Sequence, residues 1–123
     1  MKKRLLSLLL LSFLLLSCVS GSYSTVMSVE NNTGDLFSMS YSLFSGEKKR
    51  SVSLNEDETE IAVVIETQSG TLDITITDEA SGTSVYRGTD LPSSEFSVTV
   101  QPGGTYSITV HADHHCGSYD FSW

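Results

Sequence analysis

Apolar and polar residues alternate along most of this chain, and this period of two constrains the fold more than any other feature. The alternation starts near Thr25 and continues to Trp123. Successive side chains of a β-strand point to opposite faces, so a period of two predicts strands with one buried face. No stretch after Thr25 has the spacing of an amphipathic helix. The sequence therefore predicts an all-β domain.

Turn-forming residues divide the alternating region into about nine short strands. Asn31-Asn32-Thr33-Gly34 and Ser45-Gly46-Glu47 are two such turns, because Asn and Gly tolerate the positive φ that tight turns need. Ile61-Ala62-Val63-Val64-Ile65 is apolar on both faces, which predicts a central strand covered on both sides. The predicted strands span residues 26–30, 37–43, 49–55, 61–65, 72–76, 85–86, 96–100, 106–110 and 119–123.

Short strands joined by close turns favour antiparallel pairing, because parallel strands need long crossover connections. We predict a single antiparallel β-sandwich over residues 25–123, either immunoglobulin-like or jelly-roll. Its length is sufficient for a core without disulfides. The alternation places several aromatic side chains in that core rather than on a sugar-stacking platform. These are Tyr106, Tyr119, Phe121 and Trp123.

Residues 1–17 have the pattern of a secretory signal. Three cationic residues, Lys2, Lys3 and Arg4, precede an apolar run, and Ser17 follows it. The run from Leu5 to Leu16 has 12 residues, fewer than the roughly 17–25 that a transmembrane helix needs. An exported protein is therefore predicted rather than one held by a membrane-spanning helix.

Leu15-Leu16-Ser17-Cys18 resembles the lipobox of bacterial lipoproteins. The resemblance implies that the Cys18 thiol carries a diacylglyceryl group and that the signal is cut just before it. Residues 18–24 would then be a flexible tether to a bacterial membrane, either the outer membrane or the outer surface of the cytoplasmic membrane. The alternative is an ordinary secretory signal cut near Gly21 or Ser22. Cys116 has no intramolecular partner in the lipidated form, which predicts a free or intermolecularly paired thiol.

The charge balance restricts the partners. The chain has 15 acidic and 7 basic residues, a net charge of −8, so a phosphate backbone is repelled and nucleic acid is not an expected partner. Without residues 1–17, four cations face all 15 acids, a balance of −11. Membrane contact would then come from acyl chains rather than from a basic patch. The four cations are Lys48, Lys49, Arg50 and Arg87.

Three sequence segments in the second half of the chain resemble a second known family. They are Leu72-Asp73-Ile74-Thr75-Ile76, Pro102-Gly103-Gly104-Thr105-Tyr106-Ser107-Ile108 and Gly117-Ser118-Tyr119-Asp120-Phe121. In their order and spacing they are similar to the bacterial pre-peptidase C-terminal domain, a small β-sandwich found as an accessory module on secreted proteins. The turn Asp78-Glu79-Ala80-Ser81-Gly82 departs from that family's Pro-Asp-Gly phrase. The resemblance implies binding of polysaccharide or protein fibres, or assembly, and no peptidase activity.

One segment near the C-terminus is rich in possible metal ligands. Its His, Asp and Cys side chains could bind Zn²⁺ or Cu, although their spacing matches no known zinc motif and a solvated hairpin turn is the alternative. The acidic turn Asn55–Glu60 could hold Ca²⁺ or could be a solvated turn. No resident cofactor is expected beyond the lipid on Cys18. The candidate metal ligands are His111, Asp113, His114, His115 and Cys116.

The chain lacks a nucleophile elbow, a phosphate-binding loop and a zinc-protease helix, which predicts a non-enzymatic protein. Two roles stay open. The first is an interaction or assembly module that holds a protein partner in the cell envelope, with Lys48, Lys49, Arg50 and the acidic turn as a polar rim. The second is an extracellular module that binds a polysaccharide or a metal ion, with residues 111–116 as the candidate site.

Overall fold

The computed structural model describes residues 22–123, so the predicted signal segment, the Leu15–Cys18 motif and most of the predicted tether lie outside the described residues. Seven strands and no helix are present between residues 22 and 123. The strands are β1 (Tyr23–Val26), β2 (Val29–Thr33), β3 (Leu36–Ser53), β4 (Glu60–Asp78), β5 (Ser84–Gly88), β6 (Ser94–Thr99) and β7 (Thr105–Ser122).

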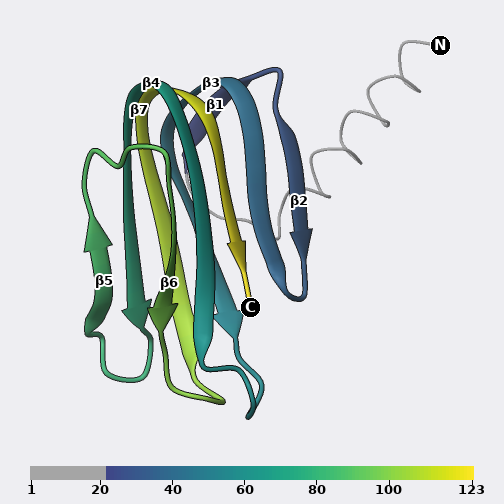
Figure 1. Cartoon of the computed structure of the whole chain (residues 1–123), viewed down its shortest axis with the longest axis vertical. Helices are drawn as coiled ribbons and strands as arrows, with labels where there is room; N and C mark the ends of the chain where they lie inside the picture. The colour runs from purple at the N-terminus through teal and green to yellow at the C-terminus, as the bar shows by residue number, and fades with distance from the viewer. Residues whose placement is uncertain (1–21) are drawn as a thin grey trace, which may run out of the picture.

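Three long strands build the molecule. β3, β7 and β4 pair side by side along almost their whole lengths, and every pairing is antiparallel. Each long strand bends over near its middle, so the sheet folds onto itself (Figure 1). The first layer contains β2, residues 36–41 of β3, residues 117–122 of β7, residues 60–67 of β4, and β6. The second layer contains β1, residues 46–53 of β3, residues 105–112 of β7, residues 71–78 of β4, and β5.

The predicted all-β antiparallel sandwich is confirmed, and the seven strands within residues 22–123 are close to the predicted number of about nine. Segments that we expected to be separate strands are continuous through the bends, where the pairing shifts register instead of ending. In β3 the shift lies at the expected turn Ser45-Gly46-Glu47, and in β4 it lies at residues 67–71. The expected turn Asn31-Asn32-Thr33-Gly34 is displaced toward the C-terminus, because β2 continues to Thr33 and the chain turns at Gly34 and Asp35.

Glycine makes the bend in β7 possible. Gly117 has a φ of +150°, and a Cβ added there would lie 1.9 Å from the backbone oxygen of Glu66 on β4. No side chain fits so close to a neighbouring strand. Gly117, which lies between the predicted strands 106–110 and 119–123, is therefore a mid-strand residue of β7.

The core lies between the two layers and follows the predicted alternation. Tyr106, Tyr119 and Phe121 are fully or almost fully buried, as expected. The ring of Phe37 lies 5.2 Å from that of Tyr119, centroid to centroid. Within the irregular stretch Tyr41–Gly46 of β3 the parity changes, so Phe44 is buried, while Leu43, which the alternation of residues 37–43 predicts inside, is 37% exposed.

The prediction that residues 61–65 are covered on both faces is wrong. Ile61, Val63 and Ile65 point into the core, whereas Val64 is 39% exposed on the outer face of the first layer. Ala62 is half-buried. β4 is central in the sheet path, but it is covered on its inner face only, as is usual for a strand of an antiparallel sandwich.

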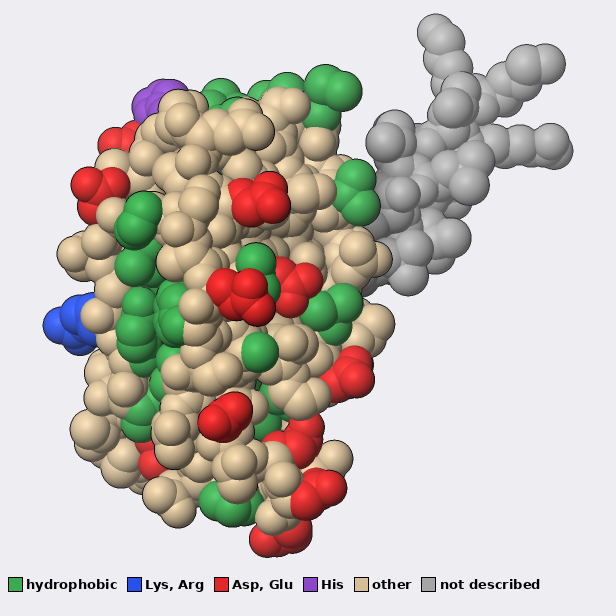
Figure 2. All heavy atoms as spheres, in the orientation of Figure 1, with side chains coloured by type: hydrophobic (Ala, Val, Ile, Leu, Met, Phe, Trp, Pro, Cys, Tyr) green, Lys and Arg blue, Asp and Glu red, His purple; other side chains and the backbone are tan. Residues whose placement is uncertain are grey.

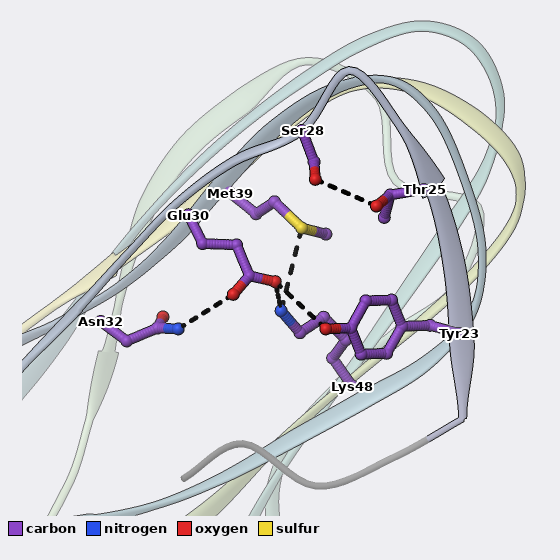
Figure 3. Close-up of polar contacts among 7 residues, drawn as sticks. All are labelled: Tyr23, Thr25, Ser28, Glu30, Asn32, Met39 and Lys48. Atoms are coloured by element: carbon purple, nitrogen blue, oxygen red, sulfur yellow. Dashed lines mark hydrogen bonds and ion pairs between the residues drawn. The ribbon is translucent and has the colours of Figure 1, made fainter. Parts of the chain in front are cut away.

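A buried ion pair joins the two layers at the β3 edge. Lys48 on the second layer is completely buried, and its Nζ is paired with the Glu30 carboxylate on β2 of the first layer. The ammonium also lies 3.8 Å from the Met39 sulfur and 4.5 Å from the centroid of the Tyr23 ring. Figure 3 shows these side chains converging on the Lys48 ammonium. Enclosure by these partners compensates the cost of burying a charge.

Arg50 and Trp123 make further contacts between the two layers at the β3 edge of the sandwich. The Arg50 guanidinium donates to the carbonyl oxygens of Thr33 and Leu36 and lies 5.2 Å from the centroid of the Trp123 ring. The Trp123 indole N–H donates to the Gly34 carbonyl at 3.1 Å. The expected basic rim is therefore wrong for Lys48, which is buried, and Arg50 is half-buried, while Lys49 between them is exposed.

Candidate functional site

A shallow depression of about 350 Å³ lies on the outer face of the second layer. Three adjacent strands form it, β3, β7 and β4, and all of its lining side chains are polar. Its volume is near the lower limit for small-molecule sites. The lining residues are Lys49, Ser51, Thr77, Glu79, Ser107 and Thr109.

Strand register brings these side chains together. Ser107 of β7 pairs with Ser51 of β3 on one side and with Thr77 of β4 on the other. Directly opposite residues on adjacent strands have their Cβ atoms about 5 Å apart on the same face. One row of the sheet therefore carries three hydroxyl groups side by side. Thr109, two positions along β7, pairs with Lys49 in the next row.

The Ser107 hydroxyl forms the floor of the depression and has no hydrogen-bond partner. Its Oγ is buried, and the residue is only 8% exposed, although it lies on the outer face of the layer. A buried polar atom without a partner destabilises a fold by about 1–3 kcal/mol. The Oγ itself is covered, so a ligand oxygen can pair with it only after the Ser107 side chain rotates toward the depression.

A cation and a carboxylate flank the hydroxyls. Lys49 is exposed at the β3 side of the depression, and Glu79 lies beyond the end of β4. The Ser51 hydroxyl donates to the Glu79 carboxylate, which orients both side chains toward the depression. The site therefore offers ammonium donors, carboxylate acceptors and hydroxyls that can both donate and accept.

The structure does not bring the five candidate metal ligands together. His111 and Asp113 are exposed on β7, with the His111 Nδ1 4.0 Å from the Asp73 carboxylate and His114 2.6 Å from Asp113. The Cys116 thiol donates to the Gln68 side chain at 3.3 Å and is a free cysteine. Within residues 22–123 no three His, Cys, Asp or Glu side chains form a group that could hold a metal ion.

His115 is buried at the bend, between hydroxyls of two other long strands. Its Nδ1 lies 2.6 Å from the Tyr41 hydroxyl on β3, and its Nε2 lies 2.8 Å from the Thr67 hydroxyl on β4. Thr67 donates its proton to the Leu91 carbonyl, so Nε2 carries the imidazole proton and Nδ1 accepts one from Tyr41. Burial lowers the pKa of His115 and raises that of Tyr41. The imidazole thus has a structural role.

The acidic turn Asn55–Glu60 is closed by its own hydrogen bonds. The Asn55 backbone N–H donates to the Glu58 carboxylate at 2.6 Å, and the Glu58 N–H donates to the Asn55 carbonyl at 3.1 Å. Glu56, Asp57 and Glu60 are exposed. The turn also belongs to the part of the chain in which no metal-ligand group is found.

The candidate site was largely invisible in the sequence. Lys49 is the one lining residue to which we assigned a functional role from the sequence, as part of the polar rim of a protein interface. Serine and threonine at outward strand positions look like ordinary solvated surface, and this chain has many of them. The signal that could have found the site is register, since Ser51, Thr77 and Ser107 meet only when three strands are correctly paired.

Comparison with known proteins gives a likeness of architecture only. No family model and no curated protein matches the chain. It aligns over 84% of its length with 81% of the Yersinia pseudotuberculosis-derived mitogen, at 9% identity and a TM-score of 0.40. It aligns over 84% of its length with 81% of TmCBM61, solved in complex with β-1,4-galactotriose, at 15% identity and a TM-score of 0.43.

A variant of CBM29-2 complexed with mannohexaose aligns over 85% of this chain and 77% of its own, at 10% identity and a TM-score of 0.42. CBM29-2 is a family 29 carbohydrate-binding module. These similarities do not show which ligand this protein binds. Residues 22–123 contain no helix that is long and apolar enough to span a membrane.

Proposed function

We propose that this protein is a non-catalytic module that binds a glycan in the depression formed by β3, β7 and β4. The observation that carries the proposal is the buried Ser107 hydroxyl, which lacks a partner at the floor of a hollow lined only by polar side chains. A change of the Ser107 rotamer would bring this hydroxyl to a bound ligand and give it the partner that it lacks.

The lining chemistry supports a polyhydroxylated ligand. A sugar presents closely spaced hydroxyls that donate and accept in turn, and the Ser51, Thr77 and Thr109 hydroxyls do the same. The Lys49 ammonium can donate to ring or hydroxyl oxygens, and the Glu79 carboxylate can accept from hydroxyls. An apolar ligand would leave all of these groups without partners.

Substitution of Ser107 tests this proposal, because binding and stability should change in opposite directions. Ser107→Ala removes a buried hydroxyl that has no partner, so the free protein should be as stable as the parent or more stable. Affinity for an oligosaccharide selected from a glycan microarray should fall about five- to tenfold, the effect of one hydrogen bond. Isothermal titration calorimetry measures the affinity, and urea unfolding measures the stability.

Ser97→Ala is the matched control, because Ser97 is exposed on β6 in the first layer, away from the depression. It should leave the affinity unchanged. Equal affinity of the Ser107→Ala variant and the parent would contradict the proposal. A reproducible protein crosslinked to the mature domain in intact cells, with no glycan bound, would favour the assembly role instead.

We also propose that the module is held at a bacterial membrane by a lipid on Cys18. The support is the sequence Leu15-Leu16-Ser17-Cys18 at the end of an apolar run behind a cationic head. Two or more acyl chains give stable attachment where one gives only marginal binding. Cys18→Ala should move the protein from the membrane fraction to the soluble exported fraction. Unchanged membrane association would contradict the anchor.

A further inference from the structure

One end of the molecule carries exposed apolar side chains around the β1–β2 turn. This apolar tip consists of Val26, Met27, Val29 and Leu43, which are 50%, 83%, 61% and 37% exposed. Val26 and Leu43 are paired residues on adjacent strands, so their side chains share one face. Figure 2 shows hydrophobic side chains at this end of the molecule, over the β1–β2 turn.

The β1–β2 turn presents the tip. Met27 has a φ of +51°, a conformation that costs a non-glycine residue energy, and it is the most exposed of the four tip side chains. The Thr25 hydroxyl donates to the Ser28 hydroxyl at 3.0 Å across the turn. Val26 pairs with Leu43 in the bend of β3, and Val29 pairs with Ser40 in the first layer, so the tip lies at the bend that joins the two layers.

The segments that form the tip carry no charge, although Asp113, on the β7 bend at the same end of the molecule, is exposed close to Ser45 of β3. Residues 18–29 contain no Asp, Glu, Lys or Arg, and neither do residues 36–46. Glu30, the next residue, is turned inward and paired with buried Lys48. At the opposite end of the molecule the acidic turn Asn55–Glu60 carries four carboxylates. Acidic side chains are visible at that lower end in Figure 2.

We propose that the apolar tip contacts the lipid bilayer, an inference that rests on the proposed anchor at Cys18. A bilayer interface accepts exposed Val, Leu and Met side chains and repels carboxylates when its lipids are anionic. The charge-free tip therefore faces the membrane, and the acidic turn points away from it. The anchor and the tip hold the domain in one orientation.

The length of the tether allows both contacts. Cys18 precedes Tyr23, the first residue of β1, by five positions, and Met27 follows Tyr23 by four. At about 3.3 Å per residue, the first segment reaches roughly 16 Å and the second spans roughly 13 Å. A tether that runs back along β1 can therefore place the acyl chains of Cys18 and the Met27 side chain in the same plane.

Tryptophan quenching in membranes tests this orientation. The full-length lipidated protein with Met27→Trp is reconstituted into phosphatidylcholine vesicles that contain acyl-brominated lipid. The matched control is Thr99→Trp, at an exposed position beside the acidic turn. We expect the fluorescence added by residue 27 to be quenched at least twice as strongly as that added by residue 99. Trp123 is present in both variants and is subtracted as background.

Vesicle flotation separates failure of the tip from failure of the anchor. Protein that floats with the vesicles and shows equal quenching at the two positions would overturn the membrane-facing tip and leave the anchor intact. Unsubstituted protein that does not float would refute the anchor itself. Equal quenching together with a dimer that Met27→Asp dissociates would assign the tip to self-association, which also overturns the inference.

Discussion

Lys48 shows how a charge can be buried in a small sandwich when its partners come from both layers. Glu30 and Met39 lie on the first layer and Lys48 on the second, so the ion pair also ties the layers together at one edge. Loss of one partner from a buried pair costs far more than replacement of both, because it leaves a charge without compensation.

Lys48→Met should therefore destabilise the protein by about 2–4 kcal/mol. The Glu30 carboxylate, 20% exposed, would lose its cation in a partly dry site. Urea unfolding gives the free energy. The double variant Lys48→Met with Glu30→Leu is the matched control and should recover most of the loss. A single variant as stable as the parent would show that the pair contributes nothing.

His115 makes stability depend on pH. Burial lowers the pKa of His115 below 6.5 in the folded protein, whereas the unfolded chain takes up its proton near 6.5. The unfolded state then binds more protons as the pH falls, so stability present above pH 6.5 is lost on acidification toward the folded pKa.

We expect the free energy of unfolding to fall between pH 7 and pH 5, as measured by urea denaturation at closely spaced pH values. His115→Gln should flatten the profile over this interval, although its absolute stability is lower. Ser97→Ala, at an exposed position without a titratable group, is the control and should keep the slope. An unchanged slope in the His115 variant would assign the pH dependence to other groups.

At the scale of elements, the bends of the three long strands restrict most strongly which residues the sequence can have. Gly117 lies where β7 approaches β4, and a Cβ there would overlap the Glu66 carbonyl oxygen. Gly117→Ala should destabilise the protein by about 3 kcal/mol, since backbone cannot move aside as a flexible side chain can. Thermal unfolding would measure the loss.

Gly34→Ala provides the control for this substitution. Gly34 lies in the β2–β3 turn, has no positive φ, and would place its Cβ with nothing within 4 Å. Its replacement should change stability by about 0.5 kcal/mol or less. Similar effects at both positions would mean that the β7 bend adjusts to a side chain.

The sequence predicted which residues form strands and which face is buried, because burial of one face imposes the period of two. It did not predict that the strands continue through Ser45–Glu47 or through residues 113–117. Glycine and polar residues favour both a chain-reversing turn and a bulge within a strand, and long-range pairing decides between them. The same pairing assembles the site, so Ser107 could not be recognised from its neighbours in sequence.

At the scale of the whole molecule, the proposed glycan site and the proposed membrane contact lie toward different ends. The bend of β3 is at Gly46, beside the tip, and the depression begins at Lys49 and continues to Ser51. At about 3.3 Å per residue, Ser51 is roughly 17 Å beyond the bend. An orientation with the tip on the bilayer keeps the depression accessible from solution.

The net charge of the domain predicts a response to salt. With four cations against 15 acids between residues 22 and 123, the folded surface repels itself, and screening reduces this repulsion. The melting temperature should rise by a few degrees when NaCl is raised from low to physiological concentration. Glu95→Gln with Asp120→Asn, which flank Val64 in one row of the first layer, should reduce the response. A salt-independent melting temperature would contradict this prediction.

Because β3, β4 and β7 each run through both layers, they also determine how the protein unfolds. Neither layer is a closed unit, because separating the layers means straightening the same three strands that hold each layer together. Amide hydrogens of these strands in both layers should therefore exchange with solvent through one cooperative opening. Those of β1, which has only four paired residues, should exchange through local fraying. A mutation in one layer is thus expected to lower the protection of the other.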